Sequence, residues 1–175
     1  MTTFPQRIIR ASLLDVDVYE EVEADRGATG QAAVVVLLSA LGAGIGSLEN
    51  AGGMGVVWQA VAALVGWWIW AWVTYMIGTR LLPGPQTEAD HGELLRTVGF
   101  SSAPGMLRLL AVFPPISGIV FLVTTLWMLV AMVVGVRQAL DYESTGRAIA
   151  VCAIGFPVYA LVLASSLLWL GPWPV

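Results

Sequence analysis

The sequence has no lysine, a single cysteine (Cys152), a single histidine (His91) and few charged residues of any kind. A lone cysteine cannot form a disulfide within the chain, and one histidine leaves no cluster of metal ligands at the usual spacing. All eight basic residues are arginines, which favours a GC-rich coding sequence and hence a bacterial source. We therefore expect no structural metal, no thiol chemistry and no bound cofactor.

Apolar residues are what the sequence has in abundance. Hydrophobic residues make up 58% of the 175 residues and charged residues 11%, with a mean hydropathy of +0.81. A soluble domain carries about 25% charged residues. Several apolar runs approach the roughly 20 residues that an α-helix needs to cross a bilayer. The composition therefore predicts an all-α integral membrane protein.

Residues 1–28 are expected to form a cytoplasmic or interfacial segment ahead of the first membrane crossing. Its start lacks the apolar stretch and small residues of a cleavable signal peptide, so we expect the N-terminus to remain on the mature protein. Thr3 and Pro5 predict the start of a short amphipathic helix, and Asp17 with Glu20 resembles the capping box of a second helix. The alternation of residues 15–18 also fits a strand.

This segment is strongly acidic. A solvated helix face is the interpretation that we favour, because runs of charge usually have that role, and a docking surface for a basic partner is the alternative. Residues 15–26 contain one basic residue, Arg26, and six carboxylates: Asp15, Asp17, Glu20, Glu21, Glu23 and Asp25.

Residues 29–175 are expected to form a bundle of five transmembrane helices, at about 29–48, 56–82, 94–113, 116–136 and 148–170. With the N-terminus in the cytoplasm and the C-terminus outside, seven of the eight arginines lie on the cytoplasmic side, as the positive-inside rule requires. A third segment that did not cross would weaken this bias. In a bacterium this topology places the chain in the cytoplasmic (inner) membrane. The arginines share that side with more carboxylates, and its net acidity argues against binding nucleic acid or anionic lipid there.

Small residues and prolines predict where these helices pack closely or bend. Proline at 104 cannot bond the carbonyl of residue 100 and should kink the third helix, while neighbouring small residues allow close approach or rebond the backbone. The residues to which we assign such packing roles are Gly42, Gly46, Ser101, Pro104, Gly105 and Pro157.

Arg108 is the one arginine expected in the outer half of the bilayer. An arginine near the centre of a transmembrane helix costs roughly 2–3 kcal/mol. One prediction is an ion pair with Glu49, the only acidic residue expected on that side. The alternative, which we favour, is that Arg108 extends to a lipid phosphate.

Four tryptophans lie near the middle of the second crossing, although tryptophan usually lies at the membrane interface. Helix packing or contact with the lipid acyl chains is the favoured interpretation, and a bound lipid, quinone or pigment is the alternative. These residues are Trp67, Trp68, Trp70 and Trp72. Three carboxylates near His91, in the loop before the third crossing, are interpreted as a solvated loop rather than an acid-base or metal site.

The chain resembles the Yip1-domain family of integral membrane proteins, in its bacterial branch, over roughly residues 11–170. The resemblance rests on five expected crossings with the N-terminus inside, on LLRTVGFSSAPGMLRLL in the third helix, and on the Phe-Pro-Pro turn after it. It also rests on Trp127, on Gly135-Val-Arg137 and on Arg147-Ala148. Eukaryotic relatives act in vesicle traffic with Rab-type GTPases. This chain has a much shorter cytoplasmic N-terminal region, so the resemblance implies the architecture rather than that activity.

We expect a non-catalytic scaffold or accessory subunit of a membrane protein assembly, which packs against itself or other membrane proteins within the lipid bilayer. The alternative is a small transporter or channel that uses proline-broken third and fifth helices around Arg108. An enzyme is less favoured because no nucleophile-base pair or carboxylate dyad lies within the apolar segments.

Overall fold

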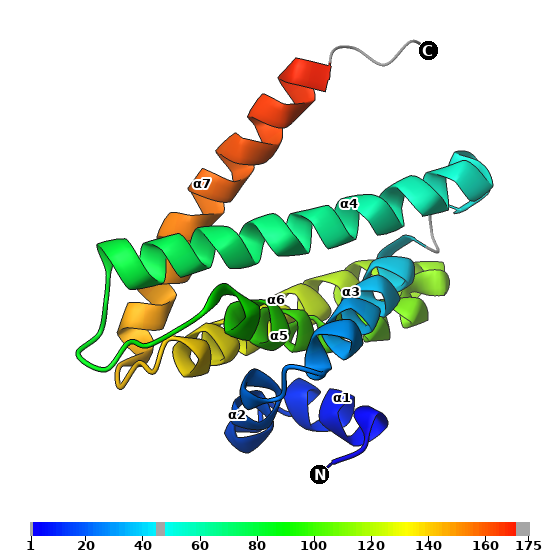
Figure 1. The fold of residues 1–175 in the computed structure, drawn as a ribbon. Helices are drawn as coiled ribbons and strands as arrows, with labels where there is room; N and C mark the ends of the chain where they lie inside the picture. The colour runs from blue at the N-terminus through cyan, green and yellow to red at the C-terminus, as the bar shows by residue number, and fades with distance from the viewer. Residues whose placement is uncertain (1, 45–47, 171–175) are drawn as a thin grey trace.

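The computed structural model describes residues 2–44 and 48–170, together with the side chains of residues 2–43 and 57–161. This part of the chain is helical with short connections and contains no strand, which confirms the expected all-α class (Figure 1). Its elements are α1 (Phe4–Ser12), α2 (Val16–Ala24), α3 (Ala28–Gly44), α4 (Leu48–Met76), the π-helical turn η2 (Ile77–Leu81), α5 (His91–Ser101), the 3-10 helix η3 (Ala103–Val112), α6 (Pro114–Ala139) and α7 (Thr145–Leu170).

The two N-terminal helices begin at residues with capping side chains. Thr3 and Gln6 form a capping box at the start of α1, where Pro5 occupies the first turn. Asp15 caps α2 by accepting a hydrogen bond from the backbone N–H of Asp17 (3.1 Å). The strand alternative for residues 15–18 is therefore wrong, and the cap lies at Asp15 rather than at Asp17.

Helix α4 is longer than predicted, since it begins at Leu48 rather than near residue 56. Its first turns contain several glycines, each of which costs a helix about 1 kcal/mol relative to alanine. A helix in apolar surroundings nevertheless satisfies its own N–H and C=O groups, which a turn there would leave open. At its other end η2 is held by the Tyr142 hydroxyl, which donates to the carbonyls of Gly78 (3.0 Å) and Leu82 (2.6 Å).

The expected third helix consists of two elements. α5 ends at Ser101, and η3 continues the segment as a 3-10 helix from Ala103. Pro104 has no N–H to offer to the Phe100 carbonyl, so the α-helical pattern ends there instead of continuing through a kink. The tighter pattern begins with the Gly105 N–H, which bonds the Ser102 carbonyl (2.9 Å).

Proline has a different effect in α7. Pro157 lies inside the helix, and α7 runs without interruption from Thr145 to Leu170. A proline removes one backbone hydrogen bond, and helices in apolar surroundings tolerate that loss. α7 therefore continues through Pro157 as one helix, and the transporter alternative stays a prediction.

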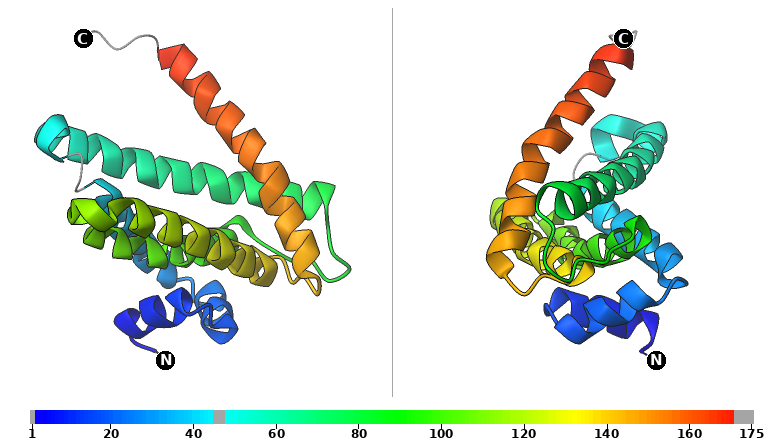
Figure 2. Two further views of the ribbon diagram at one scale, coloured as in Figure 1. Left: turned by 180° about the vertical axis from the view of Figure 1, so that it is seen from behind. Right: turned by 60° about the vertical axis from the view of Figure 1, so that its left-hand side comes forward.

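Figures 1 and 2 show how the helices are arranged: α5 and η3 lie along α6, α4 packs over them, and α3 crosses the group at an angle. One core joins α4 to α7 around Leu94, Val136 and Leu140. A second core joins α1 and α2 to α3 and α5 around Tyr19 and Phe100. The N-terminal helices are thus packed into the bundle, and the Trp127 indole of α6 donates to the Ser12 carbonyl at the end of α1 (2.7 Å).

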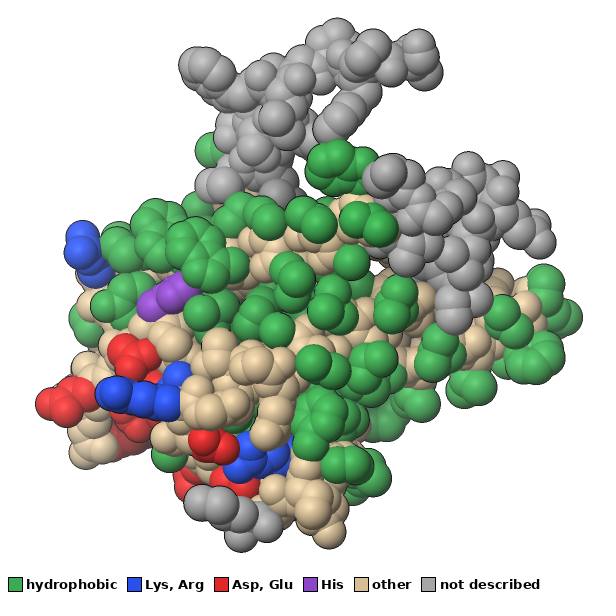
Figure 3. Space-filling model, turned by 45° about the vertical axis from the view of Figure 1, so that its right-hand side comes forward, with side chains coloured by type: hydrophobic (Ala, Val, Ile, Leu, Met, Phe, Trp, Pro, Cys, Tyr) green, Lys and Arg blue, Asp and Glu red, His purple; other side chains and the backbone are tan. Residues whose placement is uncertain are grey.

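Two helical stretches of the described chain are long and apolar enough to cross a membrane, Val57–Leu81 and Pro114–Ala139. Two shorter apolar stretches, Ala28–Ala43 and Thr145–Leu161, accompany them. Figure 3 shows charged side chains gathered at one end of the face in view, while hydrophobic side chains cover most of the remainder. This separation is the one expected of a protein whose apolar part lies in lipid.

Candidate functional site

Three of the six N-terminal carboxylates are paired with arginines of α1. Arg7, which is only 4% exposed, reaches Glu21 and Asp25, each at 2.8 Å. Arg10 reaches Asp15 at 2.7 Å. These ion pairs lower the pKa of Asp15 and Asp25, and hydrogen bonds from Thr2 and Arg7 lower that of Glu21 to about 2. Much of the acidic patch therefore holds α1 against α2 rather than remaining free for a partner.

The acidic side chains left over meet residues from two other parts of the chain. Glu20 and Glu23 of α2 share a pocket with Glu93, at the start of α5, and Asp141, after α6. Burial and these neighbouring carboxylates raise the pKa of Glu23 to about 7. Among the described residues, no group of carboxylates, histidines and cysteines has the geometry to hold a metal ion.

The carboxylates near His91 have a structural role. Asp90 caps α5 by accepting from the Glu93 N–H (2.9 Å), and the Glu93 side chain accepts from the Asp90 N–H (2.7 Å). The His91 ring lies edge-on to Trp68 (5.4 Å between ring centroids) and Tyr75 (6.3 Å). The structure thus shows a helix cap and a ring contact at this place.

The middle of α5 brings a buried arginine to α2. Arg96, 4% exposed, donates to the backbone carbonyls of Val22 (3.0 Å) and Glu23 (2.9 Å). Both carbonyls belong to the last turn of α2, where a helix leaves acceptors unpaired and favours positive charge. A second guanidinium nitrogen of Arg96 also donates to Glu23.

The four tryptophans between residues 67 and 72 of α4 face two directions. Trp68 and Trp72 are about half exposed on the outside of the bundle. Trp67 turns inward and donates from its indole to the Leu95 carbonyl (2.9 Å). Trp70 is 5% exposed and packs against Phe156 (4.8 Å between ring centroids) and Tyr159 (5.4 Å) of α7. The Trp70 indole nitrogen is buried without a hydrogen-bond partner among the described residues.

These inward-facing tryptophans line an open cavity of about 390 Å³. Its volume falls in the range of about 300–1,000 Å³ that is typical of small-molecule sites. The lining residues come from α3, α4, α5, α6, α7 and the segment around η3, and most of them are apolar: Val36, Ser39, Ala40, Ala63, Gly66, Trp67, Trp70, Val98, Ser102, Arg108, Met128, Met132, Phe156 and Tyr159.

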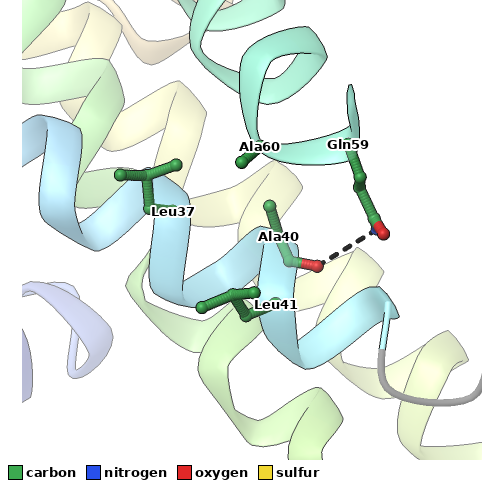
Figure 4. A pocket seen from close by; sticks show the side chains of 5 residues that line it. All are labelled: Leu37, Ala40, Leu41, Gln59 and Ala60. Carbon is green, nitrogen blue, oxygen red and sulfur yellow. Dashed lines mark hydrogen bonds between the residues drawn. The ribbon is translucent and has the colours of Figure 1, made fainter. Parts of the chain in front are cut away.

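A second hollow lies nearby on α3 and has a different character. Figure 4 shows Leu37, Ala40 and Leu41 of α3 facing Gln59 and Ala60 of α4, with the Gln59 side-chain amide bonded to the Ala40 carbonyl (3.2 Å). Its volume is about 10 Å³, room for no more than about one water molecule. It is therefore a helix-packing contact.

Among the described residues that line the large cavity, Arg108 is the only charged one. Its Nε donates to the Thr124 hydroxyl (3.2 Å) and its Nη2 to the Thr125 hydroxyl (2.9 Å), both on α6. The guanidinium also lies over the Phe121 ring, 5.5 Å from its centroid. The side chain of Glu49 lies outside the described residues, so the predicted ion pair stays a prediction.

The structure places several of the predicted packing residues where α3 and η3 meet. A Cβ atom on Gly42 would lie 3.1 Å from the Gly105 carbonyl oxygen, and one on Gly105 would overlap the Ser39 side chain. Only glycine permits this approach of the two backbones. Ser101 is buried and donates to the Val98 carbonyl (2.7 Å), so it serves its own helix. Gly46 lies outside the described residues.

Sequence reasoning finds Trp67, Trp70 and Arg108 but not their neighbours in the cavity. Phe156 and Tyr159 flank Pro157 at a spacing that puts them on one side of α7, which is a local signal for an aromatic face. Their meeting with Trp70 depends on how α7 crosses α4, and no local pattern of residues specifies that crossing.

Two long apolar helices among the described residues, and charge gathered at one end of the face in Figure 3, are typical of a helical membrane protein. The chain belongs to the Yip1 domain family, because the sequence model of that domain matches residues 15–167. The resemblance noted in the third helix and in the Phe-Pro-Pro turn is thereby confirmed. Neither the curated proteins nor the solved structures include a significant match to the chain.

Proposed function

We propose that this Yip1-domain protein is a non-catalytic scaffold or accessory subunit of a protein assembly in the bacterial cytoplasmic membrane. The observation that carries the proposal is the course of α7. Its first half packs into the bundle, with Ala148, Val151 and Cys152 buried, and its second half extends beyond α4 (Figures 1 and 2).

The extending half of α7 presents apolar side chains away from its own chain. Val158 and Leu161 of this half are both exposed, and Leu161 is 70% exposed. Lipid tails are as apolar as these side chains, so the hydrophobic effect does not drive them against another helix. Close packing does, and a helix held at an angle to its own bundle offers a groove on each side to a partner helix. The partner is another membrane protein or a second copy of this chain.

The proposal includes five crossings, with the N-terminus in the cytoplasm and the C-terminus outside. The crossings are α3, α4 with η2, α5 with η3, α6 and α7. Support comes from the arginines, seven of which lie on the inner side in this topology. A reporter fused after Gly84 or Asp141 should read as cytoplasmic and one fused after Val175 as external. A cytoplasmic signal from the reporter after Val175 would contradict this topology.

The scaffold role is tested with a tryptophan placed on the free face of α7. Leu161→Trp adds bulk there, and Leu122→Trp is a matched control because Leu122, 61% exposed, belongs to α6. Both proteins are extracted with their surrounding lipid in a polymer nanodisc, and native mass spectrometry identifies what remains bound. We expect a partner at fixed stoichiometry with the wild type and with Leu122→Trp, and its loss with Leu161→Trp.

Two results would count against the scaffold role. One is a monomer without any protein partner from every sample. The other is equal recovery of the partner with both variants, which would remove α7 as the contact surface.

A further inference from the structure

The large cavity combines an apolar wall with one cation, Arg108, for which the described side chains provide no carboxylate partner. Valine, alanine, methionine and aromatic side chains from α3, α4, α6 and α7 form the wall. Arg108 stands in the same lining, half-buried, beside the uncharged Ser39 and Ser102. Such a site suits a molecule with an apolar body and a negatively charged group.

The guanidinium of Arg108 is positioned but not neutralised. Thr124 holds it on one side, and the Thr124 hydroxyl is itself fixed by donating to the Val120 carbonyl (2.7 Å). The two bonds to Thr124 and Thr125 leave the Nη1 hydrogens and one Nη2 hydrogen of the five that a guanidinium carries. Among the described side chains no carboxylate pairs with Arg108. An arginine in apolar surroundings is stabilised by an anion, and paired N–H groups fit a phosphate.

A second group in the lining is also without a partner. The Trp70 indole N–H is buried and makes no hydrogen bond to the described residues. Buried donors are satisfied in the great majority of cases, and a tryptophan N–H normally finds an acceptor. Since the nitrogen itself has almost no accessible surface, a molecule in the cavity could reach it only after the surrounding side chains shift, so the proposal does not rest on this donor.

We propose that this cavity binds one anionic phospholipid. Its phosphate lies on Arg108, and an acyl chain lies against the aromatic wall of the cavity, which consists of Trp67, Trp70, Phe156 and Tyr159. A zwitterionic lipid offers the same chain and esters but adds a cation beside Arg108. Free phosphate pairs with Arg108 but leaves the apolar wall empty. This lipid site does not depend on the scaffold role.

Delipidated protein in a neutral detergent is titrated with phosphatidylglycerol and phosphatidylcholine of identical acyl chains, and native mass spectrometry counts the bound lipids. We expect one phosphatidylglycerol, preferred over phosphatidylcholine by at least about tenfold, the equivalent of about 1.4 kcal/mol. Arg108→Gln should abolish the preference. Arg80→Gln is the matched control, because Arg80 is an exposed arginine outside the cavity, and it should keep the preference.

A second variant keeps the cation and fills the cavity. Ala63→Phe should reduce the binding of both lipids, so the proposal remains testable where Arg108→Gln fails to fold. Equal binding of the two lipids by the wild type overturns the proposal, as does an unchanged preference in Arg108→Gln. Displacement of the lipid by millimolar inorganic phosphate also overturns it, since the site would then be an anion site only. A dimer or a complex that excludes lipid would show that a protein helix fills the cavity instead.

Discussion

Replacing Gly105 with alanine adds a single methyl group where η3 passes α3. The new Cβ atom would lie 2.9 Å from the Met128 sulfur and 3.1 Å from the Ser39 Cβ, and it would overlap the Ser39 hydroxyl. Carbon atoms in good contact are about 3.5–4.0 Å apart. The Ser39 hydroxyl and the methionine can rotate away, but the Ser39 Cβ is fixed to α3, so the two helices must separate.

The magnitude follows from two opposing effects. Forcing an extra methyl group into a packed site costs about 1–3 kcal/mol. Alanine stabilises a helix over glycine by up to about 1 kcal/mol, which offsets part of this cost. We expect Gly105→Ala to lower the free energy of unfolding by about 1–2 kcal/mol. Gly118→Ala should raise it by about 0.5–1 kcal/mol, because no atom lies within 4 Å of the added Cβ.

Reversible unfolding in mixed detergent micelles measures both variants. Adding Ser39→Gly to Gly105→Ala removes two of the three atoms nearest to the new methyl group, the Ser39 hydroxyl and Cβ, and should restore most of the loss. Equal free energies of unfolding for Gly105→Ala and Gly118→Ala would contradict the prediction, because the close approach of η3 to α3 would then not need glycine. A loss that Ser39→Gly leaves unchanged would place the strain at Met128.

Three further predictions concern other contacts. Arg96→Gln should lower the free energy of unfolding by about 2–4 kcal/mol, because it removes charged hydrogen bonds to the end of α2. The control Arg26→Gln, on the exposed surface, should change it by less than about 0.5 kcal/mol. Chemical unfolding compares the two variants, and equal losses would contradict the role of Arg96. Glu23 has a folded-state pKa raised from 4.5 to about 7, so its contribution to stability is full below pH 4.5 and is lost as the pH rises through 7. Glu23→Gln should therefore exceed the wild type by about 2–3 kcal/mol at pH 8 and match it at pH 4 in thermal unfolding, and parallel pH profiles would exclude this carboxylate. Pro104→Ala restores a backbone N–H and should extend α5 at the expense of η3. We expect a lower melting temperature in detergent, and an unchanged melting temperature would contradict this prediction.

The helices could be predicted largely from local signals. Thr3 with Pro5 marks the start of α1, and the Phe-Pro-Pro turn marks the start of α6. The spacing of Asp90 and Glu93 is a capping box in the sequence, and it places the start of α5 at His91, earlier than the periodic apolar pattern does. The early start of α4 has no such signal in the sequence. Its glycines suggest a turn, but backbone groups that water does not reach must bond one another, which favours a helix.

The contacts that build the candidate site are not local. Arg96 meets carbonyls of α2 that lie more than 70 positions away in the sequence. Trp70 and Tyr159 are in contact because α7 crosses α4 at the level of these two residues. A hydrophobic pattern fixes which side of a helix is apolar, but the crossing angle depends on the shapes of both surfaces. Sequence reasoning therefore reaches single residues of the cavity and not the cavity itself.

The 3-10 geometry of η3 makes the third segment longer than an α-helix of the same number of residues would be. A 3-10 helix rises about 2.0 Å per residue and an α-helix about 1.5 Å, so the 10 residues of η3 cover about 20 Å instead of about 15 Å. Both ends of the segment are anchored, by the Asp90 cap and by the prolines that begin α6. Conversion of η3 to α-helix would shorten the segment by about 5 Å without the loss of a residue, which is similar to the difference in thickness between natural bilayers. The same conversion would change the rotation from about 120° to about 100° per residue and would turn Arg108 away from the threonines that now hold it.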